Sequence, residues 1–343
     1  KKFDFNFKTK IDLLTAPQAL LPALQSILKS LYLKTKADLP EQLSKVNSSD
    51  EHDKIANDLI ASENGVIVLG EHLKSNPSNS VIISTVSQIA QISNSKIANL
   101  TLSGNAHSAE KVGFIPTNQG MNASSMLTES CKAFLLMDVD SQYDFFNPKL
   151  AMDLFNKDDV FVVSLTSFED QSTLLSADVI LPMASFYETS GTHINFDGIA
   201  QSFSASVKSP GDSKPGWKII KVMADLLELE GFSFVDSSQV AEEALLSSKV
   251  QTQINGSIAE SFEDSDITTL WQYAPYAIDN VTRRAKALQE SNIGKINSAY
   301  IAKSTAKKLS LSQDDLYLGV PVSISDDVAE DCVFVHTSQA RRV

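Results

Sequence analysis

The fold is decided by the stretch ADVILPMASFYETSGTHINFDGIAQSF, which runs from Ala177 to Phe203. Its first residues, Ala177–Leu181, form a short and mostly apolar run that ends at Pro182. A run of this length with β-branched residues is typical of a strand buried in a parallel sheet. Proline lacks a backbone N–H and therefore suits the end of such a strand. We expect Val179–Leu181 to be buried.

The second half of this stretch contains a turn signal. Asp197-Gly198 supplies the two positive φ values of a type I′ turn, so the residues on either side predict a β-hairpin. With a two-residue loop, Ile194, Phe196 and Ile199 share one face of the hairpin. We expect this apolar face to pack against the body of the protein.

On the N-terminal side of this stretch, short apolar runs alternate with helical patterns. The predicted strands are residues 66–69, 97–102, 133–138, 160–165 and 177–181. Helical apolar spacing separates several of them, as over residues 77–93 and 148–155. Buried strands that alternate with helices indicate βαβ units. The sequence therefore predicts an α/β fold, with a mostly parallel sheet flanked by helices.

The pattern changes along the 343-residue chain, whose length suits roughly two domains. We predict a mixed helical segment over residues 1–60 and the α/β domain over residues 61–232. An acidic, Ser-rich stretch over residues 233–268 is typical of a linker, and short β runs over residues 269–343 predict a small β-rich C-terminal domain.

The composition argues against two classes of function. The chain has 29 Lys and Arg against 42 Asp and Glu, a net charge of −13, and a surface so negative repels phosphate backbones. No apolar run approaches the roughly 18 residues that span a bilayer. We therefore expect neither nucleic-acid binding nor direct membrane insertion.

Because the chain opens on Lys1-Lys2 without a methionine or a secretory signal, it is typical of a piece of a longer polypeptide.

The sequence contains no recognisable catalytic, cofactor-binding or metal-binding motif. The five histidines lack the spacing of a metal site, and two distant cysteines, Cys131 and Cys332, are expected to be buried free thiols. No Gly-x-Gly-x-x-Gly, P-loop or Gly-x-Ser-x-Gly motif is present. We therefore assign no catalytic, cofactor-binding or metal residue to this chain.

Three pairs of charged residues have both a functional and a structural interpretation. Asp138 and Asp140 follow a predicted parallel strand, where open α/β sheets bind ligands, although acids there are also ordinary loop residues. Asp158-Asp159 is expected to be a solvated turn. Arg283-Arg284 is either a surface pair on a helix or half of an ion pair to another chain.

The residues of the opening stretch also resemble a signature of the molybdopterin oxidoreductase family. That signature is a strand that ends in Ala-Asp-Val-Val-Leu-Pro, then Glu, Gly-Thr and Asn-x-Glu-Gly-Arg. The residues that match it, with the spacing kept throughout, are Ala177, Asp178, Val179, Leu181, Pro182, Glu188, Gly191, Thr192, Asn195 and Gly198.

Further segments resemble one branch of that family, the molybdopterin-fold component of bacterial NADH-quinone oxidoreductase, the respiratory complex I. They are Pro210-Gly211-Asp212, Trp217-Lys218-Ile219-Ile220, Asn118-Gln119-Gly120, residues 276–289 and residues 321–329. One departure from the signature matters for function. Ile199 stands where the family has an arginine, so an anionic group cannot be held there by a guanidinium fork.

The resemblance implies a specific function, that of the C-terminal part of this component. There the molybdopterin-type fold persists as a scaffold, while electrons pass through iron–sulfur clusters in an N-terminal region that is absent from this chain. The expected partners are the other subunits of NADH-quinone oxidoreductase, and the expected place is the cytoplasmic side of the inner membrane. Two alternatives are a fragment of an active molybdopterin-dependent oxidoreductase and a binding module unrelated to redox chemistry.

Overall fold

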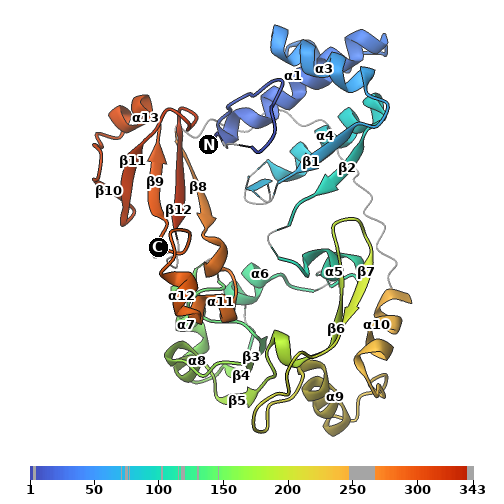
Figure 1. The fold of residues 1–343 in the computed structure, drawn as a ribbon, viewed down its shortest axis with the longest axis vertical. Coiled ribbons are helices and arrows are strands. Elements are labelled where there is room, and N and C mark those ends of the chain that lie inside the picture. The colour runs from blue at the N-terminus through green and yellow to red at the C-terminus, as the bar shows by residue number, and fades with distance from the viewer. Residues whose placement is uncertain are drawn as a thin grey trace. The chain divides into compact units, whose positions relative to one another are not determined.

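The protein forms two compact units, each built from separate pieces of the chain (Figure 1). The structure is a computed structural model that describes residues 1–2, 5–70, 72–73, 76, 78–101, 103–114, 116, 120–129, 131–145, 147–246 and 267–337. Unit 1 contains Lys1–Leu102, Thr252–Tyr273 and Ile296–Thr337, and unit 2 contains Ser103–Gln251, Ala274–Lys295 and Ser338–Val343. The predicted parts were continuous in sequence, and these units are not. Most of the predicted linker, residues 247–266, lies outside the described residues.

The N-terminal part of unit 1 packs helices on a small parallel sheet. Its helices are α1 (Pro17–Thr35), α2 (Glu41–Ser44), α3 (Asp50–Ala61) and α4 (Asn79–Ser93), and its strands are β1 (Val66–Leu69) and β2 (Lys96–Asn99). Pro17 lies in the first turn of α1, where its missing N–H costs nothing, and Ser49 caps α3. Leu28, Leu31 and Ile89 are buried where the helices meet. The mixed helical character of the N-terminal residues is as the sequence predicts.

The C-terminal part of unit 1 is a five-stranded sheet in the order β10-β11-β9-β12-β8. Its elements are β8 (Thr268–Tyr273), β9 (Asn297–Ile301), α13 (Lys303–Lys308), β10 (Leu316–Tyr317), β11 (Val320–Ile324) and β12 (Cys332–Thr337). β12 lies between β8, to which it is parallel, and β9, to which it is antiparallel. Cys332 at the start of β12 is buried, and burial raises the pKa of its thiol to about 11.

Unit 2 contains the second parallel sheet, with strand order β3-β4-β5. Its strands are β3 (Ala133–Met137), β4 (Phe161–Thr166) and β5 (Val179–Pro182), and the connecting helices are α7 (Pro148–Phe155) and α8 (Gln171–Ser176). Leu154, Phe155 and Val162 are buried between α7 and the sheet. The α/β fold class is confirmed, but the predicted strands are divided between two parallel sheets.

Unit 2 contains further short helices and a hairpin. They are α5 (Ala106–Lys111), α6 (Ala123–Thr128), η2 (Phe186–Glu188), β6 (Gly191–Ile194), β7 (Ala200–Phe203), α9 (Gly216–Leu226), α10 (Ser237–Leu246), η3 (Pro275–Ala277), α11 (Asn280–Arg284) and α12 (Lys286–Gln289). No helix among the residues described is long and apolar enough to span a membrane.

The burial expected for Val179–Leu181 is wrong in part. Val179 is 39% exposed, and Ile180 and Leu181 are half-buried. β5 pairs only with β4, so it is an edge strand, and one side of an edge strand has no neighbour to cover it.

The predicted hairpin forms as β6 and β7, but its turn differs from the prediction. Gly198 has a φ of +79°, whereas Asp197 keeps a negative φ, so a type I′ turn is excluded. The N–H of Asn195 donates to the carbonyl of Ile199 at 3.0 Å, which leaves a three-residue loop with its glycine in the left-handed region. The extra loop residue changes which side chains face inward. Ile194 is buried, as predicted. Phe196 is 47% and Ile199 56% exposed, so the prediction that these two side chains also pack against the protein is wrong.

We predict that Ile194→Ala lowers the free energy of unfolding of unit 2 by about 2–5 kcal/mol, because it removes buried methyl groups. Phe196→Ala should cost about 1 kcal/mol or less, because that ring is half exposed. Urea unfolding followed by Trp217 fluorescence measures both, in a Trp271→Phe background that leaves one tryptophan. Equal costs for the two variants would contradict this burial pattern.

Candidate functional site

The carboxyl ends of β3 and β4 bring three acidic side chains together. Asp140 and Asp144 lie in the loop after β3, and Asp170 lies after β4 as the N-cap of α8. The cap forms because the carboxylate of Asp170 accepts the backbone N–H of Thr173 at 3.0 Å. Asp140 is almost fully buried, and its Oδ1 accepts the hydroxyl of Ser172 at 3.0 Å. This edge is where an open α/β sheet places its ligands.

Two arginines of α11 occupy this edge. Arg283 donates from Nη2 to Asp144, and its Nη1 lies 3.6 Å from Oδ2 of Asp140. Arg284 pairs with Asp170, and its Nη2 lies 3.3 Å from the same oxygen of Asp140. The five residues form the acid–arginine cluster. The side chains of Asp140 and Arg283 are 2% and 9% exposed, whereas those of Asp144, Asp170 and Arg284 are 26% to 29% exposed, so only the centre of the cluster is removed from water.

Hydrogen bonds and aromatic rings orient α11 on this edge. Asp279 caps the helix by accepting two backbone N–H groups at 2.9 Å, and the amide of Asn280 donates to the side chain of Asp138 at 3.0 Å. The guanidinium of Arg283 lies 5.2 Å from the centre of the Tyr143 ring, and that of Arg284 lies 4.5 Å from the centre of Phe168. Such cation–π contacts strengthen when the groups are shielded from water.

Burial and pairing move the pKa values of two cluster acids in opposite directions. Burial raises the pKa of Asp144, against the hydrogen bond and charge of Arg283. Burial also opposes ionisation of Asp170, but hydrogen bonds from Ser172 and Thr173 and the charge of Arg284 outweigh it and lower its pKa. Of Asp144 and Asp170, it is therefore Asp170 whose ionised form is favoured by its surroundings in the cluster.

The charged groups at this edge are paired with one another, although a polar cavity remains beside them. A cavity of about 340 Å³ adjoins it, lined by Gln142, Tyr143, Asp170, Gln171, Ser172, Arg283, Arg284 and Gln289. Each cluster carboxylate already accepts hydrogen bonds or pairs with an arginine of the same chain. Within the described part of the chain, no group of three or more His, Cys, Asp or Glu side chains could hold a metal ion.

The structure places the three charged pairs in different surroundings. Asp140 is buried against the chain's own arginines, and Asp138 accepts a hydrogen bond from Asn280. Arg283-Arg284 lies on a helix, as predicted, but only Arg284 is exposed, and the acids that pair with the two arginines lie 114 to 144 residues away in the same chain. Asp158-Asp159 is an exposed turn, as predicted, and Asp159 pairs with Lys132.

Asp144 and Asp170 are not predicted from the sequence as members of a cluster. Asp170 stands directly before the helical run Gln171–Ser176, which is a recognisable N-cap signal, but nothing local indicates its arginine partner. Asp144 has no such signal.

The family-like residues of the hairpin region have local structural roles. Oδ1 of Asn195 accepts the N–H of Ile199 at 2.9 Å, and Oε2 of Glu188 accepts the N–H of Ser185 at 2.9 Å in a capping box. Ile199 is exposed at the tip of the hairpin and offers no donor to an anion. The described residues of this region therefore do not form an anion pocket.

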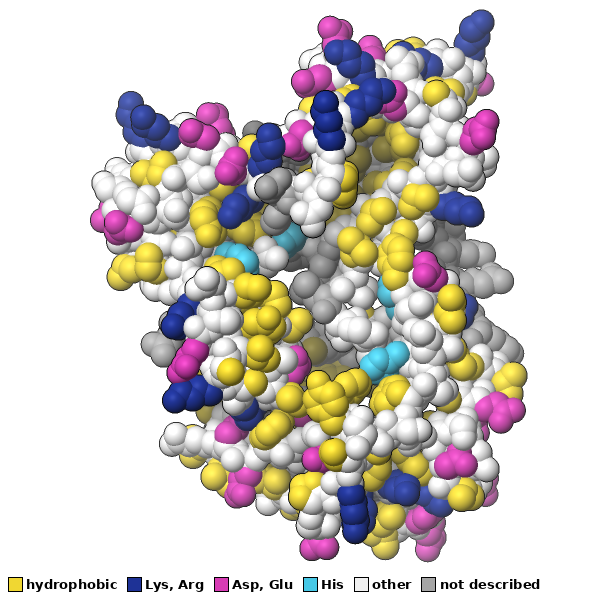
Figure 2. All heavy atoms as spheres, viewed as in Figure 1, with side chains coloured by type: hydrophobic (Ala, Val, Ile, Leu, Met, Phe, Trp, Pro, Cys, Tyr) yellow, Lys and Arg dark blue, Asp and Glu magenta, His cyan; other side chains and the backbone are white. Residues whose placement is uncertain are grey.

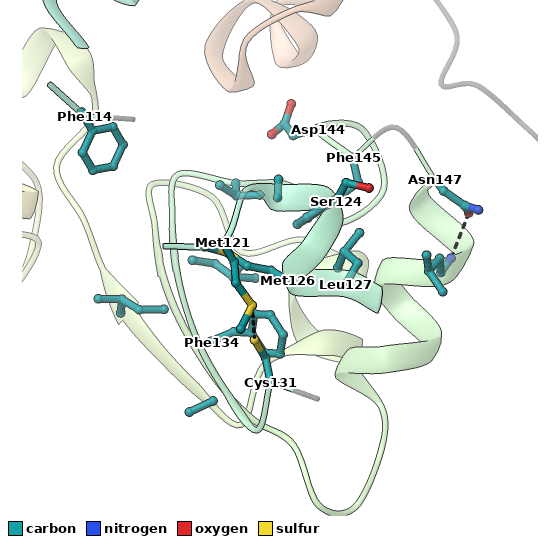
Figure 3. Close-up of a pocket in the computed structure, with 16 residues that line it drawn as sticks. Phe114, Met121, Ser124, Met126, Leu127, Cys131, Phe134, Asp144, Phe145 and Asn147 are labelled. Carbon is teal, nitrogen blue, oxygen red and sulfur yellow. Dashed lines mark hydrogen bonds between the residues drawn. The ribbon is translucent and has the colours of Figure 1, made fainter. Parts of the chain in front are cut away.

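A larger, mostly apolar cavity of about 980 Å³ borders β3 (Figure 3). Figure 3 shows Met121 and Cys131 with their sulfur atoms toward each other, at 3.7 Å, beside the ring of Phe134. The polar groups at its rim already have partners, since Oδ1 of Asn147 caps α7 and Asp144 pairs with Arg283. The cavity is open to water, since Phe114 is 85% and Leu135 48% exposed, and its lining shows no nucleophile beside a base.

Comparison with known proteins agrees with the resemblance seen in the sequence. Residues 10–226, more than half of the chain, match the family model described as "Molybdopterin oxidoreductase". The 78 kDa subunit of mitochondrial NADH-ubiquinone oxidoreductase from Candida albicans is 38% identical over 80 residues, 22% of this chain and 11% of that protein. The 75 kDa subunit from Reclinomonas americana is 23% identical over 170 residues, 49% of this chain and 24% of that protein.

Two further proteins are similar to the chain. F420-dependent formate dehydrogenase 1 subunit alpha from Methanococcus maripaludis is 33% identical over 94 residues, 27% of this chain and 13% of that protein. Acetylene Hydratase from Pelobacter acetylenicus has a similar fold, with a TM-score of 0.57 at 13% identity, over 94% of this chain and 63% of that structure. The matched segments thus span at most about a quarter of the curated relatives and under two thirds of that structure. On the family match and the shared fold, the chain belongs to the molybdopterin oxidoreductase family.

Proposed function

We propose that this chain is a structural part of the molybdopterin-fold component of an NADH-quinone oxidoreductase, with no active site of its own. The observation that carries the proposal is the acid–arginine cluster, because it occupies the edge where the α/β sheet of unit 2 would otherwise bind a ligand. The similarity to the 75 and 78 kDa subunits of NADH-ubiquinone oxidoreductases supports the assignment to that kind of complex.

The ion pairs of the cluster are better suited to stabilising the fold than to binding and releasing a substrate. Removing one partner of a buried ion pair typically costs about 3–5 kcal/mol, because an uncompensated charge stays buried. A ligand that displaced either arginine would leave Asp140, which is almost fully buried, with fewer partners. The closed arrangement therefore resists the binding and release that a catalytic cycle needs.

The residues at the carboxyl edge of the β3-β4-β5 sheet and at the hairpin do not fit a molybdopterin cofactor. Its phosphate needs N–H donors, and guanidinium forks are the strongest of these. At the sheet edge the two arginines are paired with three carboxylates, which would repel a phosphate. At the hairpin Ile199 replaces the arginine of the family pattern. We derive no reaction step through this cofactor.

The proposal extends to the surroundings of the chain. We infer that iron–sulfur clusters belong to an N-terminal region of the full subunit and that the partners are other subunits of the same complex. We place the chain on the cytoplasmic side of the inner membrane, as a peripheral component. The face in Figure 2 mixes acidic and basic side chains without a basic stripe, and for a chain with a net charge of −13 we propose no nucleic-acid partner.

One observation favours a second candidate. The 33% identity to a formate dehydrogenase alpha subunit is compatible with a fragment of an active molybdopterin-dependent oxidoreductase. That candidate needs anion-binding donors near Asn195 or Asp138, and the donors near both residues are already used within the chain. We therefore prefer the structural function.

We predict that the protein, isolated from its native cells through an affinity tag on the full-length subunit, is recovered with the other subunits of an NADH-quinone oxidoreductase. Mass spectrometry of the purified sample identifies them, and a tagged unrelated cytosolic protein serves as the control. Recovery with the subunits of a formate-type enzyme would support the second candidate, and recovery alone would contradict both.

We also predict that the purified 343-residue chain contains no stoichiometric iron, molybdenum, tungsten or pterin and does not oxidise NADH with an artificial acceptor. The reason is that its two distant cysteines cannot ligate an iron–sulfur cluster and that the arginines at its sheet edge are already paired with carboxylates. Elemental analysis, pterin fluorescence after acid extraction and an NADH oxidation assay measure these properties. A stoichiometric pterin that survives further purification would overturn the proposal.

A further inference from the structure

One segment of unit 2 lies in sequence between two strands of unit 1. Residues Ala274–Lys295 follow β8 and precede β9, yet they are packed in unit 2. This segment, called the strap below, contains η3, α11 and α12, which lie near α7 and α8 in Figure 1.

Apart from Ala274, which is buried, the apolar side chains of the strap are half-buried or exposed. None of the hydrophobic core clusters among the described residues includes a residue of the strap. Its helices have five and four residues, and helices that short are not stable alone. Two of its larger apolar side chains, Ile278 and Ile293, are exposed.

Polar contacts at one place hold the strap instead. Arg283 and Arg284 reach Asp140, Asp144 and Asp170, and Asn280 reaches Asp138. Within the strap, the amide of Gln289 donates at 2.8 Å to the carbonyls of Tyr276 and Thr282, so that η3, α11 and α12 are joined to one another. Because the strap is held together by its own hydrogen bonds and bound to the sheet edge mainly at one cluster, it can detach from that edge as a unit.

We propose that the strap covers the carboxyl edge of the β3-β4-β5 sheet, where a ligand would otherwise bind. Arg283 and Arg284 hold it there, and it can detach while the sheet stays folded. Its hold depends on charge pairing, and the sheet below has its own apolar core around Leu154 and Val162. The two parts therefore have separate sources of stability, as locally unfolding segments do. This inference does not depend on which complex contains the chain.

Hydrogen–deuterium exchange with mass spectrometry of the full 343-residue chain tests the proposal. In Arg283→Gln/Arg284→Gln, amides of the strap that are hydrogen-bonded, such as those of Arg283 and Gln289, should exchange at least about tenfold faster, a loss of about 1.4 kcal/mol in local stability. Peptides from β4 should keep their wild-type protection. Arg283→Lys/Arg284→Lys should lie in between, because lysine keeps the charge without the fork.

Lys286→Gln is the matched control. Lys286 lies on α12, is largely exposed and pairs with Glu290 at 3.7 Å, so its loss removes a strap charge without touching the acid–arginine cluster. Its exchange should equal that of the wild type. If the double glutamine variant exchanges like this control, the arginines do not lock the strap and the proposal is overturned.

A milder variant decides the case in which the double variant fails to fold. Asp170→Asn removes one partly exposed acid and leaves both arginines with Asp140 and Asp144. Faster exchange confined to the strap supports the proposal. Simultaneous loss of protection in the strap and in β4 means that the strap has no separate opening, which overturns it.

Discussion

The pairing of two arginines with three carboxylates is the interaction on which unit 2 depends at the carboxyl edge of its sheet. Water would solvate all five groups better than a protein interior does, so burying them is costly unless every charge has a partner. Asp140 contacts both guanidinium groups, while Asp144 and Asp170 each take one. The arrangement is therefore complete only when α11 is present. It specifies which segment covers the edge more strongly than apolar packing could.

This constraint explains how a fold can persist while its site changes. The strands, the hairpin and the connecting helices follow from apolar periodicity, turn residues and caps, none of which requires a ligand. The edge of the sheet is set by a few charged side chains, and the tip of the hairpin by one residue, Ile199. Membership of a family therefore transfers the architecture to this chain, whereas its chemistry has to be argued from the residues present.

The sequence allows the strands of the two parallel sheets, longer helices such as α1, α4 and α7, and the hairpin to be predicted, because their signals are local. It does not separate the two parallel sheets, because strand runs such as Val66–Leu69 and Ala133–Met137 have the same apolar character. The hairpin error has a specific cause, since a three-residue loop in place of a two-residue one changes which side chains face inward. The cluster could not be predicted, because 139 residues separate Asp144 from Arg283 and no local pattern links them.

The buried thiol of Cys332 gives the C-terminal sheet an internal reporter. With a pKa of about 11, only about one molecule in ten thousand carries the thiolate at pH 7, and the thiolate is the form that reacts with alkylating agents and disulfides. Because side chains stand on the faces of a sheet, covalent modification of Cys332 requires the residues packed over it, such as Ala16 and Ala329, to move away. The rate at which this thiol is labelled therefore reports how often that packing opens.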